Sequence, residues 1–210
     1  MLDKTVQPRI VGRSSSHFTR VTRIFAAETH VDYAFDVVRD LMSPNAGDYG
    51  GNPALKLPIL QIADGSWFGA LNICRALSRL STCDIDIVWP EVLQQPLLAN
   101  AQELTLQAMA TEVTLIMSKH AGAGNDLHQS KMRTGLANTM LWLDANVRAA
   151  LAALPPHRGL SYLEVTLFCL ITHLEFTSVL PVTDYPNLVE FGRHFGTRPA
   201  ALETLYRFDQ

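Results

Sequence analysis

The sequence has little that would indicate a secreted, metal-binding or membrane protein. Its 210 residues include only three cysteines, Cys74, Cys83 and Cys169, which are far apart and odd in number. No pair has the spacing of a metal or redox motif, which predicts reduced thiols in a cytoplasmic protein. No apolar run is long enough to span a bilayer, and residues 1–11 lack the apolar core of a signal peptide. We therefore expect no membrane partner, and the histidine spacing predicts no metal site.

Charge is also sparse and nearly balanced. Charged residues make up 18% of the chain and the formal net charge is -3. This leaves no basic surface for nucleic acid and no acidic tail. Hydrophobic residues make up 48%, which is enough for a substantial core in one large domain or two small ones.

The pattern changes near residue 80. Before it, short apolar segments alternate with helical ones. The pattern predicts strands at 8–12, 33–38 and 58–62, a very short strand after the Asp64-Gly65 turn, and helices beginning at Ser16 and Ala70. The β-α-β order implies parallel pairing and the hairpin implies antiparallel pairing. We therefore expect a mixed four-stranded sheet.

After residue 85 the sequence has no strand pattern of similar strength. Helices are predicted at 89–119 with a break near Pro96, at 126–153, from Ser161 to Phe176 and at 186–195, with a last one capped by Thr197. Ser161 and Glu164 have the spacing of a capping box, in which each side chain would bond the other's backbone N–H. The helix that follows is apolar on nearly every side, which is typical of a core helix.

Four segments occur in an order and at intervals that match one protein family. The segments are SHFTRVTRIFAAE (16–28), NPALKLPIL (52–60), SYLEVTLFC (161–169) and YPNLVEFGRHFGTRPA (185–200). By these segments the chain resembles the cytosolic glutathione transferases, in particular the serine-type members of bacteria and plants. The resemblance covers almost the whole chain. It implies an α/β thioredoxin-like domain at 1–80, a linker at 81–86 and an all-α helical bundle at 87–210.

The resemblance also implies an activity. Glutathione would be the co-substrate, its thiolate would be conjugated to small hydrophobic electrophiles, and the protein would be a homodimer. Pro58 would follow a cis peptide bond, which is uncommon. The main chain of Leu57 would then point away from the sheet and pair with the cysteinyl unit of glutathione. A trans proline at the start of an edge strand is the alternative.

A thiol with a pKa near 8.5 needs a hydrogen-bond donor or positive potential to ionise at neutral pH. In the family a tyrosine, serine or cysteine beside the first helix supplies it. Residues 8–25 contain no tyrosine or cysteine, and the candidates are Ser14, Ser15 and Ser16. Ser16 is the predicted catalytic residue, because the resemblance implies a serine two positions before Phe18, as in the plant-type and many bacterial serine members. It also stands at a helix N-terminus, which favours an anion. A pure N-cap role for Ser16 stays equally open.

Seven further residues are predicted to bind glutathione by the same resemblance. His17 could contact the thiolate, although a solvated side chain is the plainer expectation. Lys56 could pair with the glycyl carboxylate or remain an idle surface lysine. The full set is Ser15, His17, Lys56, Leu57, Pro58, Ala70 and Leu71.

Ala70 and Leu71 are the departure from the family pattern. An acidic residue and a serine or threonine usually stand at these two places and hold the γ-glutamyl end. Neither side chain here can donate or accept a hydrogen bond, so weakened glutathione binding is expected. Asn72 comes one position too late unless the helix start is shifted. Trp67 and Phe68, just before, could line the site or simply pack.

The electrophile is expected to bind along the helix at 89–119. The residues predicted to line a hydrophobic pocket are Met109, Val113, Met117 and His120, because methionines suit a pliable site. A methionine stripe at this spacing is equally typical of a core. His173 is expected to be a hydrogen-bonded core residue.

Two other functions remain open. The fold could serve as a non-catalytic binding or assembly module, which Ala70 and Leu71 favour. A glutathione-dependent isomerase or dehalogenase on the same scaffold is also compatible, because fold alone does not separate these activities.

Overall fold

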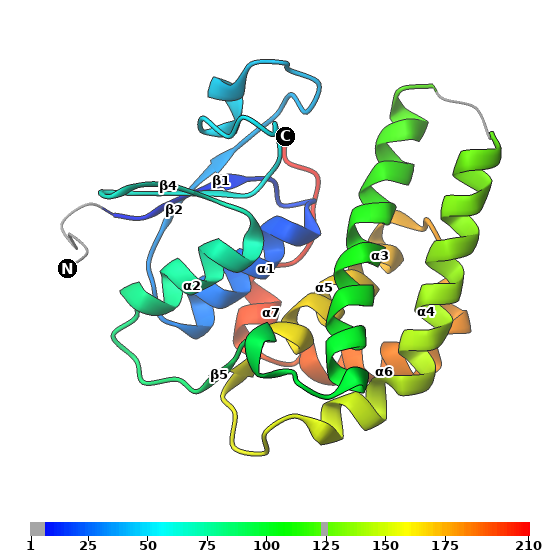
Figure 1. The fold of residues 1–210 in the computed structure, drawn as a ribbon. Helices are drawn as coiled ribbons and strands as arrows, with labels where there is room; N and C mark the ends of the chain where they lie inside the picture. Colours follow the sequence, from blue (N-terminus) through cyan, green and yellow to red (C-terminus); the bar gives the residue numbers. More distant parts are fainter. Residues whose placement is uncertain (1–6, 123–125) are drawn as a thin grey trace. The chain divides into compact units, whose positions relative to one another are not determined.

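The computed structural model describes residues 7–122 and 126–210. These form two compact units (Figure 1). The sheet unit comprises the residues up to Ile85 together with Arg198–Gln210, and the helical unit comprises Asp86–Thr197.

The sheet unit is built on four short strands in the order β2-β1-β3-β4. They are β1 (Arg9–Gly12), β2 (Ala34–Val37), β3 (Ile59–Ile62) and β4 (Gly65–Phe68). β1 pairs parallel with β2 and antiparallel with β3, and β3 pairs antiparallel with β4. The predicted mixed sheet of four strands is thus confirmed.

Two helices, α1 (His17–Glu28) and α2 (Ala70–Leu80), pack against each other in this unit. Their apolar residues recur at helical spacing, so each helix has one face for the core. Ile24 and Phe25 of α1 and Ile73 and Leu77 of α2 are completely buried. These four side chains anchor the helices whose N-termini form the candidate site below.

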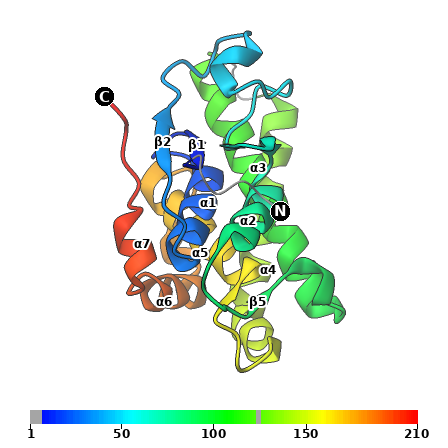
Figure 2. The same ribbon diagram turned by 90° about the vertical axis from the view of Figure 1, so that its left-hand side faces the viewer.

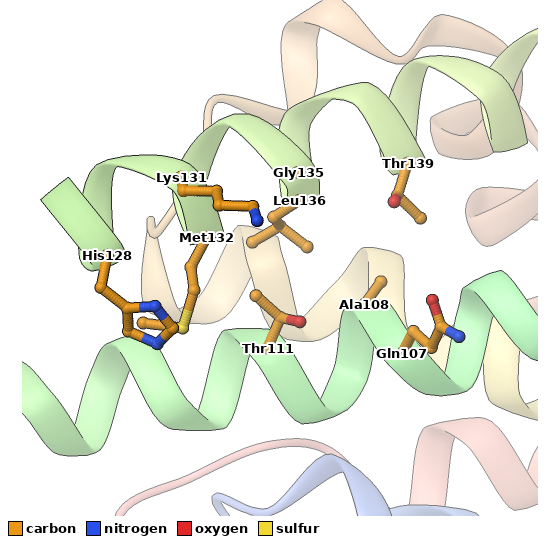
Figure 3. Close-up of a pocket in the computed structure, with 9 residues that line it drawn as sticks. All are labelled: Gln107, Ala108, Thr111, His128, Lys131, Met132, Gly135, Leu136 and Thr139. Atoms are coloured by element: carbon orange, nitrogen blue, oxygen red, sulfur yellow. The ribbon is translucent and has the colours of Figure 1, made fainter.

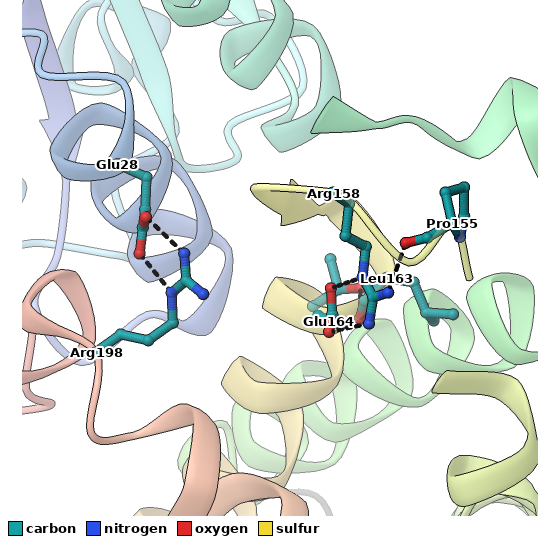
Figure 4. A network of polar contacts seen from close by, with 7 residues as sticks. Glu28, Pro155, Arg158, Leu163, Glu164 and Arg198 are labelled. Carbon is teal, nitrogen blue, oxygen red and sulfur yellow. Dashed lines mark hydrogen bonds and ion pairs between the residues drawn. The ribbon is translucent and has the colours of Figure 1, made fainter. Parts of the chain in front are cut away.

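The last residues of the described chain belong to the sheet unit. Arg198 bonds both carboxylate oxygens of Glu28 at 2.7 Å (Figure 4), and Arg20 donates to the carbonyl of Ala201 at 3.1 Å. α7 (Pro199–Glu203) therefore packs on α1. The division made from the sequence, with 87–210 as one helical domain, differs on this point. The predicted cap is also wrong, because Thr197 bonds the His194 carbonyl and the N-cap of α7 is Arg198.

The helical unit contains four long helices. They are α3 (Pro96–His120), α4 (Leu127–Ala153), α5 (Tyr162–Thr177) and α6 (Pro186–Phe195). A separate 3₁₀ turn, Pro90–Val92, precedes α3, so the predicted break near Pro96 is confirmed. α5 is buried along most of its length, as its apolar sequence predicts. Asp144 of α4 accepts from the backbone N–H of Leu188 at 2.9 Å and so holds the start of α6.

Two expectations for this unit are wrong. A short parallel pair joins β5 (Ile87–Val88) to β6 (Leu160–Ser161) where no strand was expected. The capping box is also absent, because Glu164 bonds Arg158 through two nitrogens at 2.7 and 2.8 Å (Figure 4), and the Ser161 hydroxyl has no partner in the described part of the chain. A bidentate ion pair is stronger than a carboxylate bond to one backbone N–H, which explains the exchange.

Within residues 7–122 and 126–210, every helix is too short or too polar to cross a bilayer.

Candidate functional site

The strand register brings three segments together at one end of the sheet. Val11 of β1 stands opposite Ile59 of β3, and Ile59 also stands opposite Phe68 of β4. If both registers are continued by one residue, Pro58 lies between Gly12 and Gly69. The turn after β1, the Leu57-Pro58 link and the start of α2 therefore meet at this edge.

The turn at 13–16 leads directly into α1. Gly12 is required before it, because a Cβ there would lie 2.5 Å from Cγ2 of Thr19. Ser16 is the N-cap of α1, and its Oγ accepts from the backbone N–H of Thr19 at 3.2 Å. The predicted cap is thus present. Because a hydroxyl donates one proton and accepts at two lone pairs, Ser16 can cap the helix and still donate to a sulfur.

The neighbouring residues differ in what they can offer. Ser14 is buried, and its Oγ has no hydrogen-bond partner among the described residues. Ser15 is half-buried. His17 is completely buried, with its ring edge-on to Phe18 at 4.6 Å between centroids. The plainer expectation that His17 is solvated is therefore wrong.

The Leu57-Pro58 bond is cis, as predicted. Leu57 lies just before β3, outside the strand pairing. Its backbone N–H and C=O make no hydrogen bond within the described residues. Its half-buried side chain packs against the cluster of Val11, Val38, Tyr49 and Ile59. The side chain is thus held while the main chain is available to a ligand.

The loop before Leu57 is held in shape by Asn52, which is buried. Its side-chain amide donates to the carbonyl of Lys56 at 2.7 Å, and its Oδ1 accepts from the N–H of Ala54 at 3.0 Å. The Lys56 side chain is exposed. In the sequence, Asn52 is the first residue of the segment NPALKLPIL, and no role for its side chain is predicted. Its bond four residues ahead explains why asparagine suits that place.

The start of α2 offers backbone donors and no side-chain help. Gly69 is the N-cap, with a φ of 82° that favours glycine and no side-chain cap bond. The first three N–H groups of a helix have no internal partner, and those of Ala70, Leu71 and Asn72 find none among the described residues. Asn72 turns its amide back to the carbonyl of Phe68 at 3.1 Å. α2 begins at Ala70, so Asn72 does not occupy the missing polar place.

The aromatic pair before α2 is accounted for by packing. Phe68 packs on the same apolar cluster as Leu57. The Arg79 guanidinium lies 5.0 Å from the centre of the Trp67 ring, a cation–π contact. Both side chains are half-buried, and their contacts stabilise the strand end that carries Gly69.

In the helical unit, Met109 is completely buried, whereas Val113 is 38% exposed. Met117 is half-buried and His120 is exposed. These four stay a prediction for the electrophile. The Nδ1 of His173 lies 2.8 Å from Oε1 of the buried Glu112, so the prediction of a hydrogen-bonded core histidine is confirmed.

A cavity of about 260 Å³ opens between α3 and α4 within the helical unit (Figure 3). Ala108 and Thr111 line it from α3, and Gly135 lines it from α4. Residues on a helix are about 100° apart, so Ala108 and Thr111 lie on the face of α3 opposite to Met109 and Val113. The predicted electrophile residues therefore do not form this cavity.

Comparisons with known proteins agree on the fold. No protein-family model and no curated protein sequence matches the chain. Solved structures do match, and those described below do so at low identity. A glutathione-bound glutathione transferase from Methylobacillus flagellatus has a TM-score of 0.75 at 19% identity, over 95% of this chain and 100% of that chain. One from Pseudomonas fluorescens, also with bound glutathione, has a TM-score of 0.74 at 18% identity, over 95% and 99%.

A plant example is similar at the same level. A glutathione transferase from Populus trichocarpa has a TM-score of 0.68 at 16% identity, over 94% of this chain and 97% of that chain. At these identities the likeness shows the fold alone. The chain therefore has the glutathione transferase fold, a thioredoxin-like sheet unit followed by a helical unit, as the resemblance implied.

Proposed function

We propose that the chain is a glutathione transferase that conjugates glutathione to small hydrophobic electrophiles. One observation carries this proposal: the backbone N–H and C=O of Leu57 are unpaired within the described residues, at the strand end beside the Ser16 turn. A free donor and acceptor on one residue suit a peptide ligand added like a strand. The solved proteins of this fold that contain bound glutathione support the choice of ligand.

Every part of glutathione except the α-ammonium group then has a partner. The cysteinyl main chain pairs with Leu57, and its sulfur accepts a hydrogen bond from the Ser16 hydroxyl. The positive end of α1 adds to this stabilisation of the thiolate. The γ-glutamyl carboxylate binds the free N–H groups at the start of α2, and the exposed Lys56 pairs with the glycyl carboxylate.

The chemical step is a nucleophilic substitution. The thiol first loses its proton to solvent, which the Ser16 hydrogen bond favours. The sulfur lone pair then forms a bond to the electrophilic carbon, and the leaving group departs with the bonding electron pair. Met109, Val113, Met117 and His120 stay our candidates for contacts with the electrophile.

Glutathione affinity is expected to be modest. Ala70 and Leu71 provide neither a hydroxyl nor a partner for the α-ammonium group. A missing hydrogen bond to a charged group costs about 1.5–3 kcal/mol, which corresponds to roughly ten- to a hundredfold in affinity. The dissociation constant should therefore exceed that of a relative with both polar residues by this factor.

The direct test combines binding and turnover. We expect calorimetric titration to detect glutathione binding and an activated aryl halide to be conjugated only when glutathione is present. S-methylglutathione, which lacks a free thiol, serves as the matched control and should bind without supporting conjugation. A protein that binds neither compound would contradict the proposal.

The second candidate is a non-catalytic binding or assembly module. The bare start of α2 favours it, because Asn72 is committed to Phe68 and leaves the γ-glutamyl place without a polar side chain. This candidate predicts no glutathione-dependent conjugation at any glutathione concentration. Saturable conjugation at millimolar glutathione would exclude it.

We further propose a cytoplasmic homodimer, in line with the cysteine pattern and with the family resemblance. Light scattering of the purified chain would measure its mass directly. A mass of about 23.2 kDa, that of one chain, would contradict the dimer.

A further inference from the structure

A carboxylate from the far end of the chain holds the turn at 13–16. After α7, residues 205–210 have no regular secondary structure, yet they run back beside α1 within the sheet unit (Figures 1 and 2). The Oδ2 atom of Asp209 accepts from the backbone N–H of Ser14 at 2.8 Å. The Asp209 side chain is only 7% exposed, so this bond is largely shielded from water.

Two further contacts fix this segment on the sheet unit. The Nε of Arg39, in the loop after β2, donates to the carbonyl of Gln210 at 3.1 Å. The guanidinium of Arg20, in α1, lies 4.3 Å from the centre of the Tyr206 ring. Asp209 stands between these two attachment points, which explains how a residue 195 positions away is directed to Ser14.

The other bonds described for the turn have neutral acceptors, and one of them is not local: Nη1 of Arg13 donates to the carbonyl of Arg39 at 3.1 Å. The backbone N–H of Ser16 donates to the carbonyl of Arg13 at 3.1 Å. The backbone N–H of Arg13 reaches Oγ1 of Thr19 at 3.4 Å, which is long for a hydrogen bond. The bond from Ser14 to Asp209 has an ionised acceptor, and such bonds are about twice as strong as neutral ones. It is therefore the strongest of the bonds named here, and we call it the tether of the turn.

We propose that Asp209 is a positioning residue for the thiolate site, which holds the turn so that the Ser16 hydroxyl points at the glutathione sulfur. This inference rests on the proposed function. Without the tether, the turn is held less firmly and the hydroxyl loses its fixed direction. The bound thiol then ionises less readily, and its pKa rises toward the value of a free thiol, near 8.5.

The direction of that change separates positioning from simple electrostatics. The negative charge of Asp209 would by itself disfavour a nearby thiolate. If charge were its main effect, removing it would lower the pKa of the bound thiol. Positioning predicts that the pKa rises most when the acceptor is removed and rises less when the charge alone is removed, because a neutral acceptor keeps about half of the bond strength.

Two substitutions make this distinction. Asp209→Ala removes the acceptor, whereas Asp209→Asn keeps an oxygen acceptor without the charge. Arg207→Ala is the matched control, because Arg207 is exposed, lies in the same segment and approaches Asp209 only to 3.8 Å. Hydrogen exchange at Ser14 reports the tether without glutathione. Ultraviolet titration of bound glutathione, together with the pH profile of kcat/KM, reports the thiolate.

For Asp209→Ala we expect at least tenfold faster exchange at Ser14. The thiolate midpoint should rise by about one pH unit, with about tenfold lower kcat/KM at neutral pH that recovers at alkaline pH. Asp209→Asn should change both values in the same direction but by less, and Arg207→Ala should change neither.

Three results would overturn the inference. They are unchanged exchange in Asp209→Ala, faster exchange with an unchanged thiolate midpoint, and a midpoint that falls. A native protein that binds no glutathione would contradict the proposed function and the positioning role with it. In that case the exchange data would still show whether Asp209 holds the turn.

Discussion

The two helices of the sheet unit begin in opposite ways. α1 starts at Ser16, whose side chain caps the helix, after a turn tied to Asp209. α2 starts at Gly69 without a side-chain cap, and Ala70 and Leu71 follow with no polar group. One end of the proposed glutathione site is thus fixed and has a hydroxyl, and the other offers backbone donors alone. We therefore expect the proposed site to stabilise the thiolate well and to bind the γ-glutamyl group weakly.

The largest effect is expected from removing the Ser16 hydroxyl at the start of α1. Ser16→Ala should lower kcat for aryl halide conjugation by about a hundredfold or more, since a single positioned donor to a developing or bound anion contributes this much. It should also lower the free energy of unfolding by about 1 kcal/mol through loss of the cap. Steady-state kinetics and denaturant unfolding measure the two effects.

Ser16→Asn separates the two roles of this residue. Asparagine is a good N-cap but places no hydroxyl at the sulfur. We expect near-native stability with kcat as low as in the alanine variant. If Ser16→Asn retains activity, Ser16 is only a cap and another donor serves the thiolate.

The next largest effect is expected from adding a hydroxyl at the start of α2. Leu71→Ser should strengthen glutathione binding by about tenfold, because it adds a hydroxyl beside free backbone N–H groups at the start of α2. Calorimetric titration measures the change, with Leu71→Ala as the control that removes the leucine without adding a hydroxyl. Equal affinities for the serine and alanine variants would show that residue 71 does not face the γ-glutamyl group.

A substitution at Gly12 tests how tightly the turn before α1 is packed. Gly12→Ala places a Cβ 2.5 Å from Thr19 Cγ2, and such overpacking should lower the free energy of unfolding by about 1–3 kcal/mol. The double variant with Thr19→Ser relieves the contact with Cγ2 and should recover part of the loss. Additive losses in this cycle, measured by denaturant unfolding, would place the strain elsewhere.

The smallest effect is expected at Asn72. Its amide bonds the carbonyl of Phe68 at an exposed position, so Asn72→Ala should change the glutathione dissociation constant by less than about twofold. The expected loss of stability is also small, at about 0.5–1.5 kcal/mol for one hydrogen bond. A tenfold loss of affinity would mean that Asn72 turns toward the ligand. The start of α2 would then offer glutathione a polar side chain after all.

The features that sequence predicts here are those set by local pattern. The alternating apolar segments predict the four strands, and the proline at the head of β3 is cis as the family resemblance implied. The cap at Ser16 was foreseen because its partner, the N–H of Thr19, lies three residues away. The buried character of α5 follows from its apolar composition.

The sequence fails to predict features in which one side chain has several possible partners or in which the partner is far away along the chain. Glu164 was expected to cap α5, but Arg158 binds it with two nitrogens, and spacing does not reveal which bond is stronger. The contact between Ser14 and Asp209 joins residues 195 positions apart. No local signal predicts it, because the surrounding tail has no regular periodicity. The burial of His17 is likewise set by tertiary packing rather than by its neighbours in sequence.

The membership of the last residues in the sheet unit bears on how the protein is made. A chain emerges from the ribosome amino end first, and domains generally fold as they emerge. Here the sheet and both of its helices are complete by residue 80, but Asp209 emerges only after the whole helical unit. Until Asp209 has been made, the turn at 13–16 therefore lacks its bond to that carboxylate.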